Sequence, residues 1–263
     1  GDPALQFDAC YWGSITCLLR NEPDHARHLI GLGLSLARAT GNTLNTGRAL
    51  AHLADIIRPT DPEAARSALH ESLAIFGDLH DDFREAISLR LLGMLSVQQG
   101  DYDAAFAFQM DALSIWERTG HRWGVPISLR ALAEIAVAQG DLATARSRFK
   151  ESLELWNALG ERLHMSDCCT GLARIGLEAG LVEESVLLLG AQARLDEETG
   201  YRHPGEVYRL LVAAARAAVP AERFAALWEE GKEMPLEAAL EPILAADLAG
   251  VPISTTSLPR ASG

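Results

Sequence analysis

The sequence predicts an all-α fold, in which pairs of helices repeat about every forty residues and stack into a right-handed α-α superhelix. A strict period supports this, because rows of forty residues align small and capping residues over five rows. A composition in which Ala and Leu dominate and aromatic residues make up only 6% also favours helix over strand. The aligned glycines are Gly100, Gly140 and Gly180, and the aligned aspartates are Asp61, Asp101 and Asp141.

Capping residues predict where the second helix of each repeat begins and ends. The three aspartates suit N-caps, where a carboxylate accepts hydrogen bonds from free backbone N–H groups. Gly120, Gly160 and Gly200 suit the left-handed position that ends a helix. The helices predicted in this way are 5–19, 23–39, 44–57, 61–78, 82–99, 102–118, 123–139, 141–158, 162–179, 181–198, 202–218, 220–231 and 235–247.

Small and large side chains alternate in a way that indicates how the helices pack. Where two helices cross closely, only a methyl group or a hydrogen atom fits, and one turn away a larger side chain fills the gap. We expect each buried aromatic residue in such a column to cost about 3–5 kcal/mol when it is truncated to Ala. The predicted structural positions are Gly93, Gly100, Ala105, Trp116, Ala133, Gly140, Ala145 and Trp156.

The chain divides into three parts on this interpretation. Residues 1–219 form the helical repeats, residues 220–249 form C-terminal capping helices, and residues 250–263 form a linker or disordered tail rich in Ser, Thr and Pro. The chain begins without Met and has no charged and apolar leader, which suggests a piece of a longer protein.

Charge and cysteine content narrow the classes of function. A net charge of −13 without a basic stripe argues against direct contact with nucleic acid. No apolar run is long enough to span a membrane. Four cysteines do not make a disulfide framework in a chain of this size, so we expect a cytoplasmic location. No motif indicates a cofactor or a metal.

One stretch, from Leu89 to Ala105, carries a family resemblance. It reads Leu-Arg-Leu-Leu-Gly-Met-Leu-Ser-Val-Gln-Gln-Gly-Asp-Tyr-Asp-Ala-Ala, and it resembles the tetratricopeptide repeat, which has Leu-Gly before a Gly-Asp-Tyr turn and an Ala after it. The pattern recurs forty and eighty residues later. The family's usual unit has about 34 residues, so the longer period implies longer helices. That longer form is similar to the repeats of the maltose-regulon activator group and the large ATP-binding LuxR-type regulators.

A second segment supports the same group. Residues 188–239, with Leu-Leu-Gly-Ala at 188–191 and Phe-Ala-Ala-Leu-Trp-Glu-Glu-Gly at 224–231, resemble the end of the repeat region in those regulators. The resemblance implies a non-enzymatic sensor or interaction module of a bacterial multidomain transcriptional regulator. The implied partner is a peptide, a protein domain or a small inducer. The sequence given contains neither a DNA-binding helix-turn-helix nor a phosphate-binding loop.

One column of the first helices predicts a ligand-binding groove. In tetratricopeptide stacks this column faces the concave side, and Arg suits it because a guanidinium donates two parallel hydrogen bonds to a carboxylate. The alternative is that Arg90 and Arg130 pair with Glu85 and Glu134 as a solvated ladder of charges. The expected groove residues are Arg90, Met94, Arg130, Glu134, Thr170 and Arg174.

Other functions stay open. If the module is instead a scaffold, its groove holds the ATPase domain of the same parent chain, or it holds a second copy of the module and forms a homodimer. Cys10 and Cys17 with neighbouring histidines match no zinc spacing and suit small apolar positions. Of Cys168 and Cys169, we expect one to face the core and the other to face the groove, where redox sensing is an option.

Overall fold

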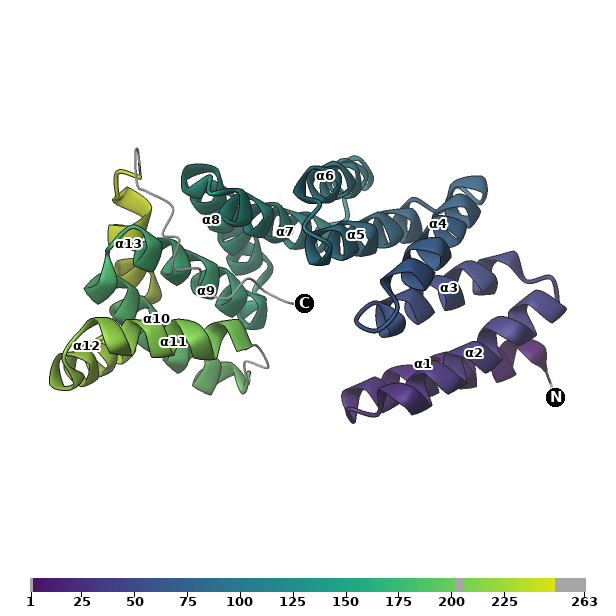
Figure 1. Ribbon diagram of the computed structural model, residues 1–263, viewed down its shortest axis with the longest axis horizontal. Helices are drawn as coiled ribbons and strands as arrows, with labels where there is room; N and C mark the ends of the chain where they lie inside the picture. Colours follow the sequence, from purple (N-terminus) through teal and green to yellow (C-terminus); the bar gives the residue numbers. More distant parts are fainter. Residues whose placement is uncertain (1, 202–205, 249–263) are drawn as a thin grey trace. The chain divides into compact units, whose positions relative to one another are not determined.

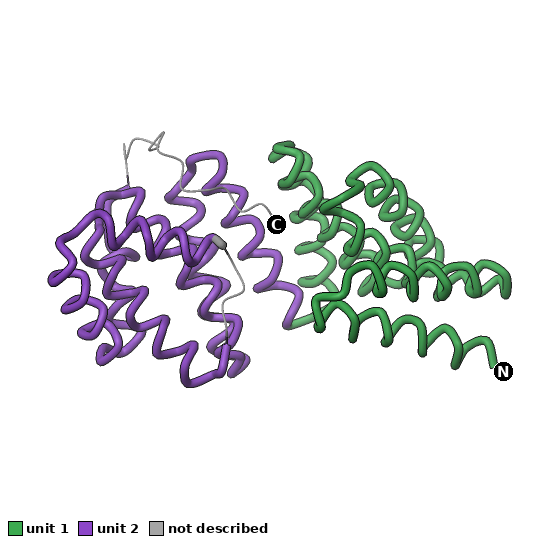
Figure 2. Tube along the Cα trace, turned by 60° about the horizontal axis from the view of Figure 1, so that its bottom comes forward, with its two compact units in different colours: residues 1–122, 263 green, residues 123–262 purple. Residues whose placement is uncertain are grey.

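The computed structural model describes residues 2–201 and 206–248, and these residues form helices and no strand. The chain divides into two compact units between Arg122 and Trp123 (Figure 2). The helices of unit 1 are α1 (Pro3–Leu19), α2 (Pro23–Ala39), α3 (Thr43–Ile57), α4 (Pro62–Asp78), α5 (Asp82–Gln98) and α6 (Tyr102–Thr119). Those of unit 2 are α7 (Gly124–Gln139), α8 (Leu142–Leu159), α9 (Arg162–Glu178), α10 (Val182–Thr199), α11 (Glu206–Ala218), α12 (Ala221–Glu233) and α13 (Leu236–Ala245) (Figure 1).

Unit 1 is a series of three helical hairpins. Helices α1 and α2, α3 and α4, and α5 and α6 pair within hairpins, and α2 packs on α3 as α4 packs on α5. A buried hydroxyl chain joins the last two hairpins: Ser72 of α4 donates to the carbonyl oxygen of Gly47 at 3.0 Å, and its hydroxyl lies 3.0 Å from that of Ser88 on α5. The all-α repeat architecture predicted from the period is confirmed.

Unit 2 begins with the same hairpins and ends differently. Helix α7 pairs with α8, α8 packs on α9, and α9 pairs with α10. Helix α12 then packs along α10 more extensively than α11 does, and α13 packs on α9 and α10. The regular order of hairpins therefore stops at α10.

The predicted caps are confirmed. Oδ1 of Asp101 accepts a hydrogen bond from the backbone N–H of Ala104 at 3.1 Å, and Asp61 and Asp141 do the same three residues on, each at 3.0 Å. The hydrogen bonds from Thr144 lower the pKa of Asp141, because they stabilise its carboxylate. Gly120 ends α6 with φ 66°, in the left-handed region.

The predicted packing columns are buried. Ala105, Ala133 and Ala145 have no exposed surface, and a methyl group on Gly93 would lie 2.7 Å from Nε2 of Gln109. The indole of Trp116 is 3% exposed and that of Trp156 is 1% exposed.

Each buried indole is held between two further rings. Phe83 and His121 have ring centroids 5.4 and 4.8 Å from that of Trp116. Trp123 and His164 take the same places around Trp156, at 5.5 and 4.4 Å. The repeating columns do not predict these surrounding rings. The rings leave a space that an indole fills and that a smaller side chain would leave partly empty.

Most helix boundaries lie within two residues of the predicted ones. The start of the helix predicted at 202–218 and the tail predicted at 250–263 lie outside the described residues. The division expected between 219 and 220 stays a prediction. Among residues 2–201 and 206–248, no helix combines the length and the apolar character needed to cross a bilayer.

Candidate functional site

Partly and fully buried polar side chains gather on α7, α9 and α10 of unit 2. Arginine, aspartate, tyrosine, amide and hydroxyl groups interact there although the surrounding helices are mainly apolar. We call this group the polar cluster, and its members are Arg130, Ser166, Asp167, Thr170, Gln192, Asp196 and Tyr201.

Hydrogen bonds join α9 to α10 within the cluster. The amide Nε2 of Gln192 donates to the hydroxyl oxygens of Ser166 at 3.0 Å and of Thr170 at 2.7 Å. Ser166 in turn donates to Oδ1 of Asp196. Ser166 and Gln192 have no exposed surface, and Asp196 is 9% exposed. Such a connected network fixes the relative position of its two helices, because breaking one bond leaves a buried polar group without its partner.

Asp196 replaces an aromatic residue of the repeat. The equivalent positions in the three preceding repeats, at intervals of forty residues, hold Trp156, Trp116 and Phe76, and all three are buried. A carboxylate in such a place is costly unless hydrogen bonds compensate it, and the Ser166 hydroxyl supplies one. The α9–α10 hairpin therefore keeps the architecture of the repeat but has a polar interior at this point.

Arg130 brings positive charge to the cluster from α7. Its Nη1 lies 3.0 Å from Oε1 of Glu134, one turn along the helix, and the two side chains are 33% and 37% exposed. Burial is the largest influence on the pKa of Arg130 and lowers it, but the nearby carboxylates of Glu134 and Asp167 together raise that pKa above its ordinary value. The guanidinium therefore stays charged and reaches solvent beside a carboxylate.

Tyr201 lies at the edge of the cluster, directly after α10. Its hydroxyl donates to Oδ1 of Asp167 at 3.2 Å. Burial, reinforced by the negative charge of Asp167, raises the pKa of Tyr201 to about 12. The phenol is consequently a stable hydrogen-bond donor at neutral pH.

The residues predicted to line a groove belong to two different units. Arg90 and Met94 are on α5 of unit 1, where Nη1 of Arg90 lies 3.0 Å from the Met94 sulfur. The other four are in unit 2, and there Arg130 and Thr170 belong to the polar cluster. Arg174 pairs with Glu178 at 2.9 Å, and their side chains are only 14% and 12% exposed. The binding role of all six stays a prediction.

The expectation for the paired cysteines is wrong. Cys168 and Cys169 are both fully buried, and neither faces a groove. Cys168 donates to the Ser152 hydroxyl at 3.4 Å on the neighbouring helix α8. Burial raises the pKa of Cys168 to about 12 and also raises that of Cys169, so both remain thiols at neutral pH. Adjacent positions on a helix both become buried when neighbours cover two of its sides.

Potential metal ligands are scattered along the described part of the chain. Among residues 2–201 and 206–248, no three His, Cys, Asp or Glu side chains are placed to hold one ion. Cys10 and Cys17 are partly buried on α1.

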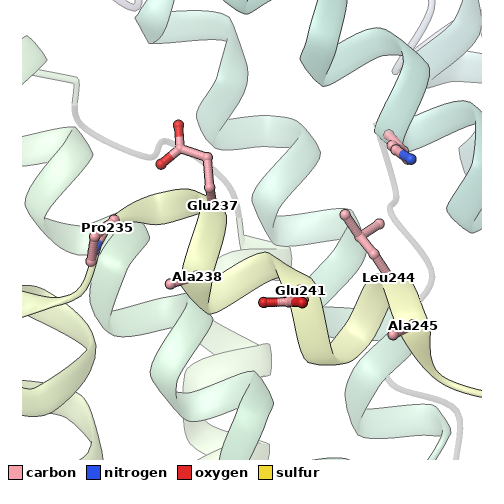
Figure 3. A pocket seen from close by; sticks show the side chains of 7 residues that line it. Pro235, Glu237, Ala238, Glu241, Leu244 and Ala245 are labelled. Atoms are coloured by element: carbon pink, nitrogen blue, oxygen red, sulfur yellow. The ribbon is translucent and has the colours of Figure 1, made fainter.

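Two hollows lie beside α13. One, of about 670 Å³, is lined by Lys150 of α8 and by Glu237 and Glu241 of α13, and Figure 3 shows the two glutamates along α13. The second, of about 460 Å³, includes Arg162 and Arg194 and shares Glu237 with the first. Arg162 already pairs with Glu198 at 2.7 Å, and Arg194 donates to the carbonyl oxygen of Lys232 at 2.8 Å. We therefore place the candidate site at the polar cluster, where the Arg130–Glu134 pair remains accessible.

Comparison with known proteins identifies the repeat. Residues 84–158, which span α5 to α8, match the family model described as tetratricopeptide repeat. The fold is that of tetratricopeptide repeats. No curated protein sequence matches the chain significantly.

Several solved structures are similar to most of this chain. A Rap protein complexed with competence and sporulation factor aligns with a TM-score of 0.68 at 13% identity, covering 92% of this chain and 76% of that one. A signal transduction ATPase with numerous domains and a tetratricopeptide repeat sensor, from Pyrococcus horikoshii, gives 0.66 at 12% identity, with 92% and 39% covered. PilF of Pseudomonas aeruginosa gives 0.59 at 15% identity, with 92% and 98% covered. At these identities the likeness establishes the fold alone.

Sequence reasoning found two members of the polar cluster and missed five. The missed residues are Ser166, Asp167, Gln192, Asp196 and Tyr201. Asp196 carried a usable signal, because it is the acidic exception in a column of aromatic residues. The others carried none, since a tetratricopeptide repeat tolerates polar residues on its surface and the pattern does not show which of them are buried together.

Proposed function

We propose that this chain is a tetratricopeptide-type interaction module that binds a peptide, or an extended segment of a partner protein, at the polar cluster of unit 2. The observation that carries the proposal is the Arg130–Glu134 pair, which is about one-third exposed. The charge of Asp167 acts on Arg130, and Tyr201 donates a hydrogen bond to Asp167. Support from a second layer of side chains keeps a binding group in one orientation and reduces the entropy lost when a ligand binds.

The pair suits a polypeptide ligand chemically. The guanidinium of Arg130 donates to a peptide carbonyl or a terminal carboxylate, and the carboxylate of Glu134 accepts from a peptide N–H. An extended backbone presents both kinds of group within a few ångströms of each other. A ligand therefore replaces the exposed hydrogen bond between Arg130 and Glu134 with bonds of its own, and neither side chain is left unpaired.

The wider role that we infer is that of a non-enzymatic sensor in a bacterial, cytoplasmic, multidomain transcriptional regulator. The resemblance of residues 188–239 to the LuxR-type regulators supports it. So does the likeness to an ATPase that carries a tetratricopeptide repeat sensor, of which this chain covers 39%. A small inducer is a further ligand class for the same site. The alternative is a scaffold that holds the ATPase domain of its own parent chain.

Selection from a displayed library of random peptides tests the proposal. We expect selected peptides to stabilise the protein against heat, by about 2.7 kcal/mol at 100 times the dissociation constant. Arg130→Ala should weaken binding at least tenfold. The matched control is Arg118→Ala, which removes an exposed arginine of unit 1 that is paired with Asp82 at 2.8 Å.

The two variants separate the outcomes. Peptides that bind the Arg130→Ala protein as tightly as the original protein overturn the proposed site. If only Arg118→Ala weakens binding, the ligand binds unit 1 instead. Titration of a selected peptide into the Tyr201→Phe variant, which loses the hydrogen bond to Asp167 and keeps the ring, measures how much that hydrogen bond contributes to peptide affinity.

A further inference from the structure

Helix α1 has an apolar stripe on its solvent-facing side. Leu5, Trp12 and Leu19 are 69%, 59% and 84% exposed, and they follow one another at intervals of seven residues. Residues spaced by seven lie on one side of a helix, two turns apart. Of the 17 residues of α1, only Asp8 is charged, although the whole chain has a net charge of −13. This side of α1 is therefore poorly suited to solvent.

The same side of the later helices packs against another hairpin. Forty residues after Trp12, His52 of α3 faces α1: its Nε2 lies 3.1 Å from Oγ of Ser14, and its ring centroid lies 5.1 Å from that of Tyr11. Forty residues further on, Leu92 of α5 has no exposed surface. The position of Trp12 is thus one that the fold uses to join hairpins.

A hairpin placed before α1 in the usual register would not cover the whole stripe. For the three helices that pack on a preceding hairpin, α3, α5 and α9, the positions equivalent to Leu19 are Pro59, Gln99 and Ala179. Pro59 and Gln99 are exposed and Ala179 is half-buried. Only in α1, among the first helices of the hairpins, is this position held by Leu. A hairpin in the usual register would therefore leave Leu19 largely exposed, whereas a partner that runs along the full length of α1 would cover it.

We propose that a second copy of this chain covers the stripe, with the two α1 helices antiparallel and Trp12 on the two-fold axis. The stripe is symmetric about Trp12, so an antiparallel pair places Leu5 of each copy opposite Leu19 of the other. One turn inside, Ala9 lies opposite Ile15, which gives the indole rings room at the centre. A two-fold contact of this kind uses the same patch on both copies.

Charge also favours a second copy at this place. Two chains with a net charge of −13 repel each other, and they associate most readily where the local charge is small. In the antiparallel arrangement Asp8 lies opposite Thr16 rather than opposite another carboxylate. One helix pair is a small interface compared with the roughly 800 Å² per partner of a standard one, so we expect a dissociation constant on the order of micromolar.

Sedimentation equilibrium over a range of protein concentrations tests the proposal. We expect the original protein to dimerise, and Trp12→Glu to raise the dissociation constant at least tenfold. Phe106→Glu, at a residue of α6 that is 43% exposed, is the control and should leave it unchanged. Arg130→Glu should also leave it unchanged, which separates this contact from assembly through the proposed peptide site. Circular dichroism melting confirms that each variant is folded.

Two complementary variants test the orientation. Leu5→Glu and Leu19→Lys should each weaken dimerisation. An equimolar mixture of the two should form a mixed dimer, because the introduced carboxylate of one copy then faces the introduced ammonium group of the other, and two leucines meet at the opposite end. A parallel mixed dimer would contain no such pair and would gain only relief from like-charge repulsion. A mixed dimer that added salt does not weaken would therefore indicate the parallel orientation.

Two results overturn the proposal. One is a protein that stays monomeric at about 100 μM, well above a micromolar dissociation constant. The other is a Trp12→Glu variant that dimerises as tightly as the original protein.

Discussion

Gly190 of α10 and Gly231 of α12 meet at a crossing where the two helix backbones touch. A Cβ atom on Gly190 would lie 3.1 Å from the Cα of Gly231 and would overlap the carbonyl oxygen of Trp228. A Cβ atom on Gly231 would overlap the carbonyl oxygen of Leu187. Only glycine fits on either side, so α12 packs on α10 as closely as two helices can approach.

Gly231→Ala should therefore destabilise unit 2. The added methyl group has rigid backbone as its neighbour, so the helices must separate, and we expect a loss of about 1–3 kcal/mol in the free energy of unfolding. The matched control is Gly77→Ala near the end of α4, where a Cβ atom meets nothing within 4 Å. Alanine there should stabilise the protein by up to about 1 kcal/mol through helix propensity. Urea denaturation measures both, and a Gly231→Ala protein as stable as the control would contradict the close crossing.

Asp196→Ala should destabilise the polar cluster. It removes the buried hydrogen bond that Ser166 donates to this carboxylate, and a hydrogen bond to a charged group contributes about 1.5–3 kcal/mol. Glu197→Ala, one residue further on, removes a carboxylate that is 67% exposed and paired with Lys232. Its effect should stay within about 0.5 kcal/mol. If thermal or urea denaturation gives the two variants the same stability, the network does not hold α9 against α10.

The tyrosines of unit 2 predict a loss of stability at high pH. Burial raises the pKa of Tyr201 and of Tyr208 to about 12, whereas an unfolded tyrosine ionises near a pKa of about 10. Between these values the unfolded chain has released protons that the folded chain keeps, so stability falls as the pH rises. The slope is at most about 1.4 kcal/mol per pH unit for each tyrosine, and less where solvent reaches the ring.

Chemical denaturation between about pH 9 and pH 12 measures this slope. The original protein and Tyr201→Phe are compared, and the variant should show the shallower slope because one of the two tyrosines no longer titrates. Identical slopes would mean that Tyr201 ionises equally easily in the folded and unfolded chains.

His80 should be replaceable by glycine with a gain in stability. It ends α4 with φ 52°, in the left-handed region, at the position that Gly120 occupies after α6 with φ 66°. A non-glycine side chain in this region costs about 1–2 kcal/mol. Glycine avoids this cost, but it makes the unfolded chain more flexible, which offsets part of the gain in stability. We expect His80→Gly to add about 0.5–1 kcal/mol and Gly120→His to remove about 1 kcal/mol in thermal denaturation. A destabilised His80→Gly protein would show that the imidazole makes contacts that outweigh the backbone strain.

Local rules made most of the fold predictable. A cap such as Asp101 or Gly120 depends on its own neighbours in the chain, so the repeating pattern located the ends of nearly every helix. Burial of Trp116 followed from its column alone. Cys168 and Cys169 show the limit, because a period of forty places a residue on a helix but does not say how many neighbours surround that helix.

The candidate site was less predictable because it departs from the repeat. Arg130 was found because it shares a column with Arg90, but Asp167, whose charge acts on Arg130, belongs to the next hairpin and to a different column. The crossing of α12 on α10 was also not foreseen, since the pattern assigned that place to the helix that follows α10 directly. Contacts that break a period cannot be derived from it.

Helix α10 packs against two neighbouring helices, α9 and α12. Gln192 and Asp196 connect it to α9, and less than one turn before Gln192 the same helix touches the backbone of α12 through Gly190. With no side chain between the two backbones, nothing there can deform to absorb a movement. If a ligand binds the polar cluster as proposed and shifts α10, α12 must therefore move with α10 at this crossing.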